Sequence, residues 1–279
     1  MIYFVGAGSG APDLITVRGA KLLGEADVIV YAGSLVNPAL LDYAKGDCAI
    51  YDSAKMTLEE VIAVMAPAAR AGKTVVRLHT GDPCVYGAHR EQMDALDRLG
   101  LAYEICPGVS SFCGAAAALK AEYTLPNVSQ TVILTRMEGR TPVPEREQIE
   151  SLAAHGATMV IFLSAGQLEK LSARLIEGGY APETPAAIVY KATWPDEKVV
   201  RTTVGELAAA GAREGITKTA LITVGGFLGD SYDRSKLYDP AFTTGFREAS
   251  DEAREIRLLY RNRCTDCRES CPAAAGFSV

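Results

Sequence analysis

Several short segments of the sequence carry residue types and spacings that could do chemistry. Gly6, Gly8 and Gly10 follow an apolar run, which is how a dinucleotide site begins. Their alternating spacing differs from the G-x-G-x-x-G fingerprint, and no acidic residue ends the next apolar run, where an NAD site holds the ribose. No Gly-Lys-Ser/Thr ending of a P-loop follows either. The spacing therefore argues against a nicotinamide site, and an ordinary strand-to-loop turn is the alternative.

The segments LHTGDPCVYG, residues 78–87, and PGVSS, residues 107–111, each follow a β-rich run. Ligands of open α/β sheets collect at the carboxyl ends of strands, so both segments are candidate ligand loops. Asp82 could accept hydrogen bonds from an amine or a hydroxyl, and an ordinary Gly-Asp-Pro turn is the alternative. Ser110 or Ser111 could contact a ligand, cap the helix that follows, or do both.

Three closely spaced cysteines, Cys264, Cys267 and Cys271, could bind zinc or an iron–sulfur cluster as thiolates. A fourth cysteine is missing, although a fourth ligand could come from a partner chain, and a flexible, redox-sensitive tail is the alternative. No two of the three histidines have metal-ligand spacing. The remaining cysteines lie in or beside apolar stretches, and we expect reduced core thiols of a cytosolic protein at Cys48, Cys84, Cys106 and Cys113.

Composition narrows the classes of partner and compartment. The 279 residues are 48% hydrophobic and 22% charged, with a net charge of −6, so no broad basic surface indicates nucleic acid. No run approaches the roughly 18 apolar residues of a membrane span. The first residues lack a basic region and a cleavage site, so we expect no secretion signal and a cytoplasmic protein without a membrane segment.

Apolar β-rich runs alternate with amphipathic stretches through the first part of the chain. Strands are expected at 1–5, 26–31, 73–79 and 102–106, and helices at 16–26, 57–72 and 86–100. Thr57 and Glu60 have the spacing of a capping box. Continuous apolar strands separated by helices predict a largely parallel sheet covered on both faces.

A small-residue helix and a Pro-containing turn, residues 112–128, precede a second such series. Strands are expected at 130–135, 157–163, 186–190, 198–204 and 219–227, and helices at 145–156, 165–179 and 203–215. We therefore predict two α/β domains, residues 1–117 and 129–240, joined by the linker 118–128. Residues 241–279 are predicted to form an appended helix and a short Cys-containing tail.

The motifs GAGSGAPDLIT, ADVIVYAGSLV, TGDPCVYG and PGVSS, in this order, closely resemble the tetrapyrrole (corrin/porphyrin) methyltransferases, which use S-adenosylmethionine. The resemblance covers residues 1 to about 240. YAGSLV, TVILTRMEGRTPVP and YKATWPDEKVVRTTV further resemble the branch that methylates C11 of precorrin-4 in cobalamin synthesis. The resemblance implies the tetrapyrrole methylase fold, with two α/β domains, a cleft between them and usually a homodimer.

The resemblance also implies roles for individual residues. The S-adenosylmethionine contacts would be Thr80, Gly81, Asp82, Val85, Ser110, Ser111, Leu163, Ala192, Thr219 and Ala220. Most relatives have Met near Leu163 and Pro near Thr219, and both departures fall on apolar or backbone roles. Plain core packing is the alternative for Leu163 and Ala220. In this family the first glycine loop, here with Gly8 and Ser9, is thought to help hold the tetrapyrrole.

Methyl transfer from sulfonium to carbon depends mainly on the alignment of nucleophile, methyl group and sulfur, and a general base could help if a proton leaves. Glu91 is the candidate base or substrate positioner, because related uroporphyrinogen methylases have an acidic residue at the matching place. Their nearby arginine is Ala88 here, and a solvated helical side chain is the alternative for Glu91. Tyr86 is a second candidate for the cleft.

The substrates of this family carry many carboxylates, which calls for basic side chains in the cleft. Arg136 and Arg140 could pair with them, with surface salt bridges as the alternative, and Met137 could contact cofactor or macrocycle. Precorrin-4 and cobalt-precorrin-4 are both open as substrates. The competing hypotheses are methylation of another ring position, a diphthamide-synthesis methylase, a nicotinamide oxidoreductase, and a metal-binding module dependent on the tail.

Overall fold

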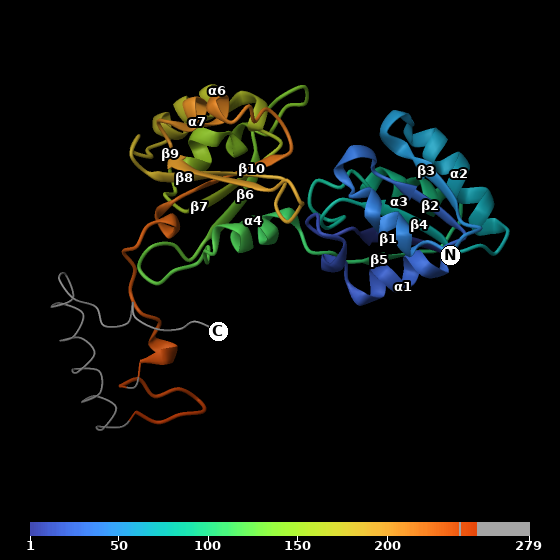
Figure 1. Ribbon diagram of the computed structural model, residues 1–279, viewed down its shortest axis with the longest axis horizontal. Helices are drawn as coiled ribbons and strands as arrows, with labels where there is room; N and C mark the ends of the chain where they lie inside the picture. The colour runs from blue at the N-terminus through green and yellow to red at the C-terminus, as the bar shows by residue number, and fades with distance from the viewer. Residues whose placement is uncertain (240, 250–279) are drawn as a thin grey trace. The chain divides into compact units, whose positions relative to one another are not determined.

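The computed structural model of the protein describes residues 1–239 and 241–249. Two five-stranded sheets organise it, with strand orders β3-β2-β4-β1-β5 and β6-β7-β10-β8-β9 (Figure 1). The first sheet contains β1 (Ile2–Gly6), β2 (Val28–Tyr31), β3 (Ala49–Asp52), β4 (Val75–His79) and β5 (Tyr103–Cys106). The second contains β6 (Val132–Arg136), β7 (Thr158–Phe162), β8 (Pro185–Tyr190), β9 (Lys198–Thr203) and β10 (Ala220–Val224).

Every strand pair of the first sheet is parallel, as the sequence predicts. Helix α1 (Val17–Glu25) packs on one face through Leu22 and Leu23. Helices α2 (Leu58–Arg70) and α3 (Arg90–Arg98) pack on the other face, against Ile2 and Phe4. Both faces are therefore covered, which confirms the prediction from the continuous apolar strands.

The second sheet has mixed strand directions. β6 and β7 are parallel, whereas β10 is antiparallel to both β7 and β8, and β8 is antiparallel to β9. Helices α5 (Ile149–Ala153), α6 (Leu168–Glu177) and α7 (Leu207–Arg213) contribute to one buried core with these strands. Because β10 runs against its neighbours, its first residue lies at the same edge of the sheet as the last residues of β7 and β8.

Helix α4 (Ser111–Leu119) follows β5 of the first sheet but contacts β8 and β10 of the second. Figure 1 shows it on the face opposite α6 and α7. Arg201 of β9 donates a 2.7 Å hydrogen bond to the carbonyl of Leu119. One compact unit comprises residues 1–124 and 129–230, and residues 125–128 group separately with 231–239 and 241–249. The domain boundaries drawn from the sequence stay a prediction.

Local details depart from the sequence analysis in two places. Strand β3 was not expected, and its residues are exposed. The helix predicted to start at residue 86 starts only at Arg90, because Tyr86 and Ala88 have left-handed backbone angles, with φ of 56° and 48°. The capping box of Thr57 and Glu60 is present as predicted.

The expectation of core thiols was correct for one cysteine only. All four described cysteines are free, and Cys106 is buried, but Cys84 and Cys113 are exposed and Cys48 is half-buried. The tail helix and the three clustered cysteines fall in 250–279, outside the described residues. Within the part of the chain that the structure describes, no helix is long and apolar enough to cross a membrane.

Candidate functional site

Three loops meet at the carboxyl edge of the first sheet, after β1, β4 and β5. Gly8 and Gly81 form an isolated antiparallel bridge, with N–H···O distances of 3.2 and 2.9 Å in the two directions. A Cβ atom on Gly108 would lie 2.3 Å from the carbonyl oxygen of Gly81 and 2.7 Å from Cα of Gly6. The three backbones touch one another, which only residues without a side chain allow. The first glycine loop is thus part of one structure with the Gly-Asp-Pro loop.

The carboxylate of Asp82 joins two of these loops. Its Oδ1 accepts a 2.8 Å hydrogen bond from the N–H of Cys84 in its own loop. Its Oδ2 accepts one of 2.8 Å from the N–H of Gly108 in the loop after β5. The carboxylate therefore ties together the loop after β4, which contains the candidate cofactor residues Thr80 and Gly81, and the loop after β5. Hydrogen bonds to a charged acceptor are stronger than neutral ones, so this arrangement stabilises the loops.

The matching edge of the second sheet is built from strained loops. Leu163 after β7, Lys191 and Thr193 after β8, and Thr219 before β10 all have positive φ, between 45° and 68°. Non-glycine residues in this region cost about 1–3 kcal/mol each, and such residues gather at functional sites. Leu163 is also 67% exposed, although it is a large apolar residue. Among the candidate contacts here, Ala192 is buried and Ala220 is half-buried.

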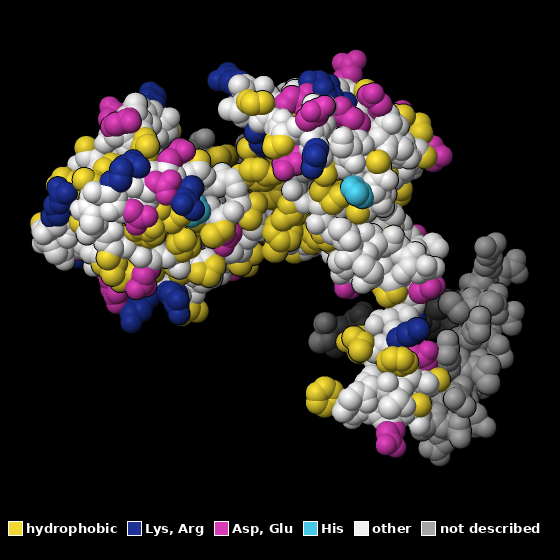
Figure 2. Space-filling model, turned by 180° about the vertical axis from the view of Figure 1, so that it is seen from behind, with side chains coloured by type: hydrophobic (Ala, Val, Ile, Leu, Met, Phe, Trp, Pro, Cys, Tyr) yellow, Lys and Arg dark blue, Asp and Glu magenta, His cyan; other side chains and the backbone are white. Residues whose placement is uncertain are grey.

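The loops of the two sheets meet at a junction, which we define as residues 9–11, 86, 162 and 193–194. The hydroxyls of Ser9 and Thr193 are 3.1 Å apart, and the ring centres of Tyr86 and Phe162 are 5.1 Å apart. Figure 2 shows hydrophobic side chains gathered between the region of the first sheet and the region of the second. Tyr86 is 45% exposed, and partial burial raises the pKa of its hydroxyl. Tyr86 therefore stays protonated at neutral pH and can donate a hydrogen bond.

The candidate substrate residues of the RMEGRTPVP segment have different environments. Arg136 donates hydrogen bonds to the carbonyls of Met137, Thr141 and Pro142, at 3.1, 3.3 and 2.8 Å. Its guanidinium thus shapes the loop that follows β6. Met137 is 2% exposed and belongs to the core of the second sheet, whereas Arg140 is exposed.

The remaining candidates lie at the start of two helices. Glu91 is exposed in the first turn of α3, and Val85 is half-buried in the loop before that helix. Ser110 occupies the N-cap position of α4, but its hydroxyl makes no capping hydrogen bond there. Ser110 is buried and Ser111 is half-buried. The first amide groups of α4 therefore have no side-chain acceptor from the cap.

Two histidines and an arginine line the core beneath the Gly-Asp-Pro loop. Burial lowers the pKa of His79 to about 3, helped by the charges of Arg77 and His89. The Nε2 atom of His79 has no hydrogen-bond partner. Arg77 is 6% exposed, and its guanidinium donates to Gln92 and to the carbonyl of Val30. His79 is thus a neutral core residue, one position before Thr80.

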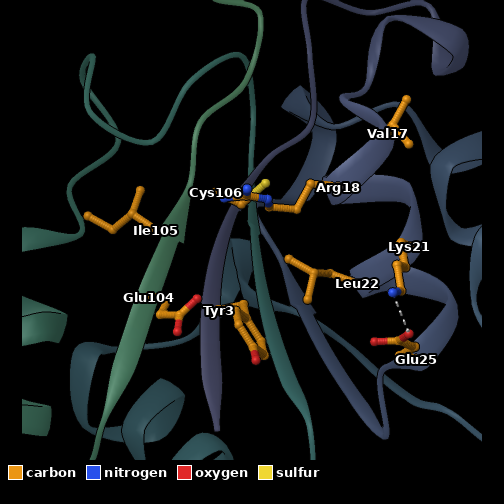
Figure 3. Close-up of a pocket in the computed structure, with 9 residues that line it drawn as sticks. All are labelled: Tyr3, Val17, Arg18, Lys21, Leu22, Glu25, Glu104, Ile105 and Cys106. Atoms are coloured by element: carbon orange, nitrogen blue, oxygen red, sulfur yellow. Dashed lines mark ion pairs between the residues drawn. The ribbon is translucent and has the colours of Figure 1, made fainter.

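The open pockets lie away from these loops. The larger one, about 410 Å³, is a groove between α1 and β5. Figure 3 shows Arg18 and Cys106 among the side chains that line this groove, and the ion pair of Lys21 with Glu25, whose charged atoms are 3.8 Å apart. The second pocket lies between α2 and α3. Neither of these two pockets is lined by a candidate site residue.

The sequence analysis missed Thr193, Trp194 and Phe162, which form the second sheet's side of the junction. A Cβ atom on Gly10 would lie 2.2 Å from Cδ1 of Trp194. One feature of the sequence could have indicated Trp194: it is the single tryptophan of the chain and lies in the YKATWP segment. Among residues 1–239 and 241–249, no group of three His, Cys, Asp or Glu side chains could hold a metal ion. The metal site expected at Cys264, Cys267 and Cys271 stays a prediction.

Comparison with known proteins agrees with this architecture. Residues 1–208 match the family described as Tetrapyrrole (Corrin/Porphyrin) Methylases. A cobalt-precorrin-4 C(11)-methyltransferase of Methanocaldococcus jannaschii is 55% identical over 89% of this chain and 96% of that protein. A precorrin-4 C(11)-methyltransferase of Mycobacterium tuberculosis is 46% identical over 86% of this chain and 96% of that protein.

Two solved structures show the same fold. The structure of a cobalamin biosynthetic enzyme, cobalt precorrin-4 methyltransferase, has a TM-score of 0.80 and 51% identity, covering 82% of this chain and 96% of that one. A uroporphyrin-III C-methyltransferase of Thermus thermophilus, in complex with S-adenosylhomocysteine, has a TM-score of 0.68 and 28% identity. That match covers 81% of this chain and 98% of the other.

Proposed function

This chain belongs to the tetrapyrrole (corrin/porphyrin) methylase family, and we propose that it transfers the methyl group of S-adenosylmethionine to C11 of precorrin-4 or cobalt-precorrin-4. The observation that carries the proposal is the 55% identity to a cobalt-precorrin-4 C(11)-methyltransferase over nearly all of that protein's length. The reaction would serve cobalamin biosynthesis. Family membership removes the support for a nicotinamide oxidoreductase.

The residues around the junction suit a cofactor with an apolar part and a charged amino-acid part. Leu163 offers an exposed apolar surface, and the first amide groups of α4, beside Ser110 and Ser111, suit a carboxylate. We propose that Thr80, Gly81, Val85, Ala192, Thr219 and Ala220 complete the contacts, with Asp82 holding the loops. S-adenosylmethionine supplies an activated methyl group on a sulfonium centre.

The chain's own contribution to the reaction would be alignment. Gly8 and Ser9 would lie against the macrocycle, and Arg140, which is exposed and has no ion-pair partner among the described residues, would meet one of its carboxylates. Tyr86, protonated at neutral pH, would donate a hydrogen bond, and Glu91 would accept the proton that leaves the substrate. Positioning of this kind contributes several kcal/mol to barrier reduction. Arg136 and Met137 would shape the loop behind these contacts.

The test begins with calorimetric titration by S-adenosylhomocysteine, with NAD as the parallel control. We expect heat with the former and none with the latter. Precorrin-4 and cobalt-precorrin-4 are then incubated with S-adenosylmethionine, and the added methyl group is located by NMR. Methylation at another ring position would contradict the C11 assignment. Binding of neither ligand, together with no turnover, would contradict the methylase proposal itself.

The two relatives are named for different substrates, cobalt-precorrin-4 and precorrin-4. The ratio of the kcat/KM values for these two compounds decides which of them this chain prefers. We further propose that the protein is a homodimer in the cytoplasm. Sedimentation velocity measures the first property, and fractionation of cells expressing the full chain measures the second. A metal bound by the three tail cysteines stays a hypothesis, which metal analysis of the purified full chain tests.

A further inference from the structure

The geometry points to Thr193 as a positioning residue that fixes the first glycine loop on the second sheet and so forms the substrate side of the site. The inference rests on the proposed function, because that function places the tetrapyrrole beside Gly8 and Ser9. Thr193 has no assigned role in the chemistry. Its side chain nevertheless lies at the middle of the junction, where a loop of the second sheet contacts a loop of the first.

The hydroxyl of Thr193 contacts two residues of the glycine loop. It accepts a hydrogen bond of 3.0 Å from the N–H of Ala11 and lies 3.1 Å from the hydroxyl of Ser9. These partners are more than 180 residues away in the sequence. No other side chain among the described residues forms a hydrogen bond with Ser9 or Ala11, so this hydroxyl is the polar link that holds them to the second sheet.

Thr193 makes these contacts in an unfavourable backbone conformation. Its φ is 68°, and a β-branched residue at positive φ is a genuine outlier, which costs free energy. The side chain of Glu197 accepts a 2.6 Å hydrogen bond from the N–H of Thr193 and so helps to hold that conformation. Among the described residues, the hydrogen-bond partners of this strained side chain both belong to the glycine loop, which indicates that the contact is the reason for the strain.

The adjacent Trp194 covers the residue between those two partners. Its indole occupies the space that a Cβ atom of Gly10 would need, at 2.2 Å. The ammonium group of Lys191 lies 5.3 Å from the indole ring centre and is paired with Asp196 at 2.6 Å. A cation over the ring stabilises this position of the indole. Ser9, Gly10 and Ala11 are thus all held by Thr193 and Trp194.

The other end of the glycine loop is held by the first sheet, through the two hydrogen bonds between Gly8 and Gly81. Loss of the Thr193 hydroxyl therefore frees Ser9 and Ala11, whereas the carbonyl of Gly10 keeps its 2.9 Å hydrogen bond from Asn37 and the Gly-Asp-Pro loop stays in place. The substrate contact should weaken, while the cofactor contact should not. This separation distinguishes positioning of the glycine loop from a general effect on folding.

The experiment compares Thr193→Val, which keeps the branched shape without the hydroxyl, with Thr193→Ser, which keeps the hydroxyl. Trp194 is the single tryptophan, so acrylamide quenching of its fluorescence reports on the cover over Gly10. We expect more quenching in the valine variant and wild-type quenching in the serine variant. The KM for precorrin-4 should rise about tenfold in the valine variant, as expected for one lost hydrogen bond, with the Kd for S-adenosylhomocysteine within about twofold.

Ser9→Ala provides a second variant, because Ser9 is not among the non-glycine residues with positive φ and alanine can adopt its backbone conformation. Its effect on KM should be smaller than that of Thr193→Val, and the double variant should show less than the product of the two single effects. Equal quenching in the valine variant and the wild type, equal loss in the serine and valine variants, or a matching fall in S-adenosylhomocysteine affinity would each overturn the proposal.

Failure of the proposed function would look different. If the wild-type protein methylates neither precorrin-4 nor its cobalt complex, the function proposal fails. The quenching comparison between the serine and valine variants is independent of turnover, so it still decides whether Thr193 fixes the glycine loop. Increased quenching in the valine variant alone supports that role, and identical quenching in all three proteins refutes it.

Discussion

The two sheets contribute to the site by opposite means. In the first sheet, loops after three parallel strands touch through the backbone of Gly6, Gly81 and Gly108, and a Cβ atom on Gly6 or Gly108 would not fit. In the second sheet, the corresponding edge carries non-glycine residues at positive φ, among them Leu163 and Thr193. The first sheet provides close backbone approach at these glycines, and its residues at positive φ, Tyr86 and Ala88, lie further along the loop after β4. The second provides side chains in positions that cost backbone free energy.

This difference indicates which residues of the site can be substituted without loss of stability. A glycine that permits contact between backbones cannot take a side chain, because the neighbouring carbonyl has no room to move. A strained side chain can be replaced by glycine with a gain in stability, and what is lost then is its function. The sign of the stability change on substitution therefore separates the two halves of the site.

The largest expected effect is that of Gly108→Ala. The added Cβ would lie 2.3 Å from the carbonyl oxygen of Gly81, so the loops after β1, β4 and β5 must separate. We expect a loss of roughly 3–5 kcal/mol in the free energy of unfolding, measured by urea denaturation. Gly46→Ala is the matched control, because a Cβ there meets nothing within 4 Å. A similar small effect for both variants would contradict the close contact.

Asp82→Asn tests the side-chain link between the same loops. The amide retains one acceptor oxygen but places an NH2 group against one of the two backbone N–H donors, so one hydrogen bond is lost. We expect a loss of about 2 kcal/mol in unfolding free energy, with a weaker affinity for S-adenosylhomocysteine as a consequence. The exposed Asp42→Asn serves as the control in both measurements. Unchanged stability with reduced affinity would instead make Asp82 a direct cofactor ligand.

Acid should destabilise the first sheet through His79. Burial holds the pKa of His79 at about 3 in the folded protein, against 6.5 for a histidine free in water. Because the pKa of His79 is lower in the folded state, its contribution to the free energy of unfolding is fully present above pH 6.5. That contribution is lost as the pH falls through 6.5 towards 3. At pH 5 the loss should be about 2 kcal/mol, since the unfolded chain binds a proton that the folded chain excludes.

Urea unfolding at pH 7 and pH 5 measures this effect. His79→Leu should abolish the roughly 2 kcal/mol difference in unfolding free energy between the two pH values, because leucine does not titrate. His155 is exposed and lies in the part of the chain that forms the second sheet, so His155→Gln should leave the difference unchanged. An identical fall in stability for the wild type and the leucine variant would show that other groups account for the acid sensitivity. Hydrogen exchange at β4 and β7 would then show whether the two sheets lose protection together.

The contrast between the sheets also explains how far the sequence could predict the site. Glycine and proline motifs such as Gly81-Asp82-Pro83 mark turns after apolar strands, so four strands of the first sheet and the loops that follow them were predictable, whereas the exposed strand β3 was not. The mixed order of the second sheet and the strain at Leu163 and Thr193 leave no local signature, because both depend on contacts between distant segments. Asp82 illustrates the limit: its residue type suggested a ligand contact, which stays a prediction, whereas the hydrogen bonds of its carboxylate to two loops could not be predicted from the sequence.

Leu163→Gly should give the smallest change in stability, and one of opposite sign to Gly108→Ala. Leu163 has φ of 53° and is 67% exposed, so glycine relieves backbone strain and removes little buried surface. We expect a gain of about 1 kcal/mol in unfolding free energy, together with a weaker affinity for S-adenosylhomocysteine. Leu99→Gly is the control, because Leu99 is also exposed but has φ of −90°, so glycine should destabilise there. A stabilised Leu163→Gly variant with unchanged affinity would mean that the strain at this edge serves the fold and not the ligand.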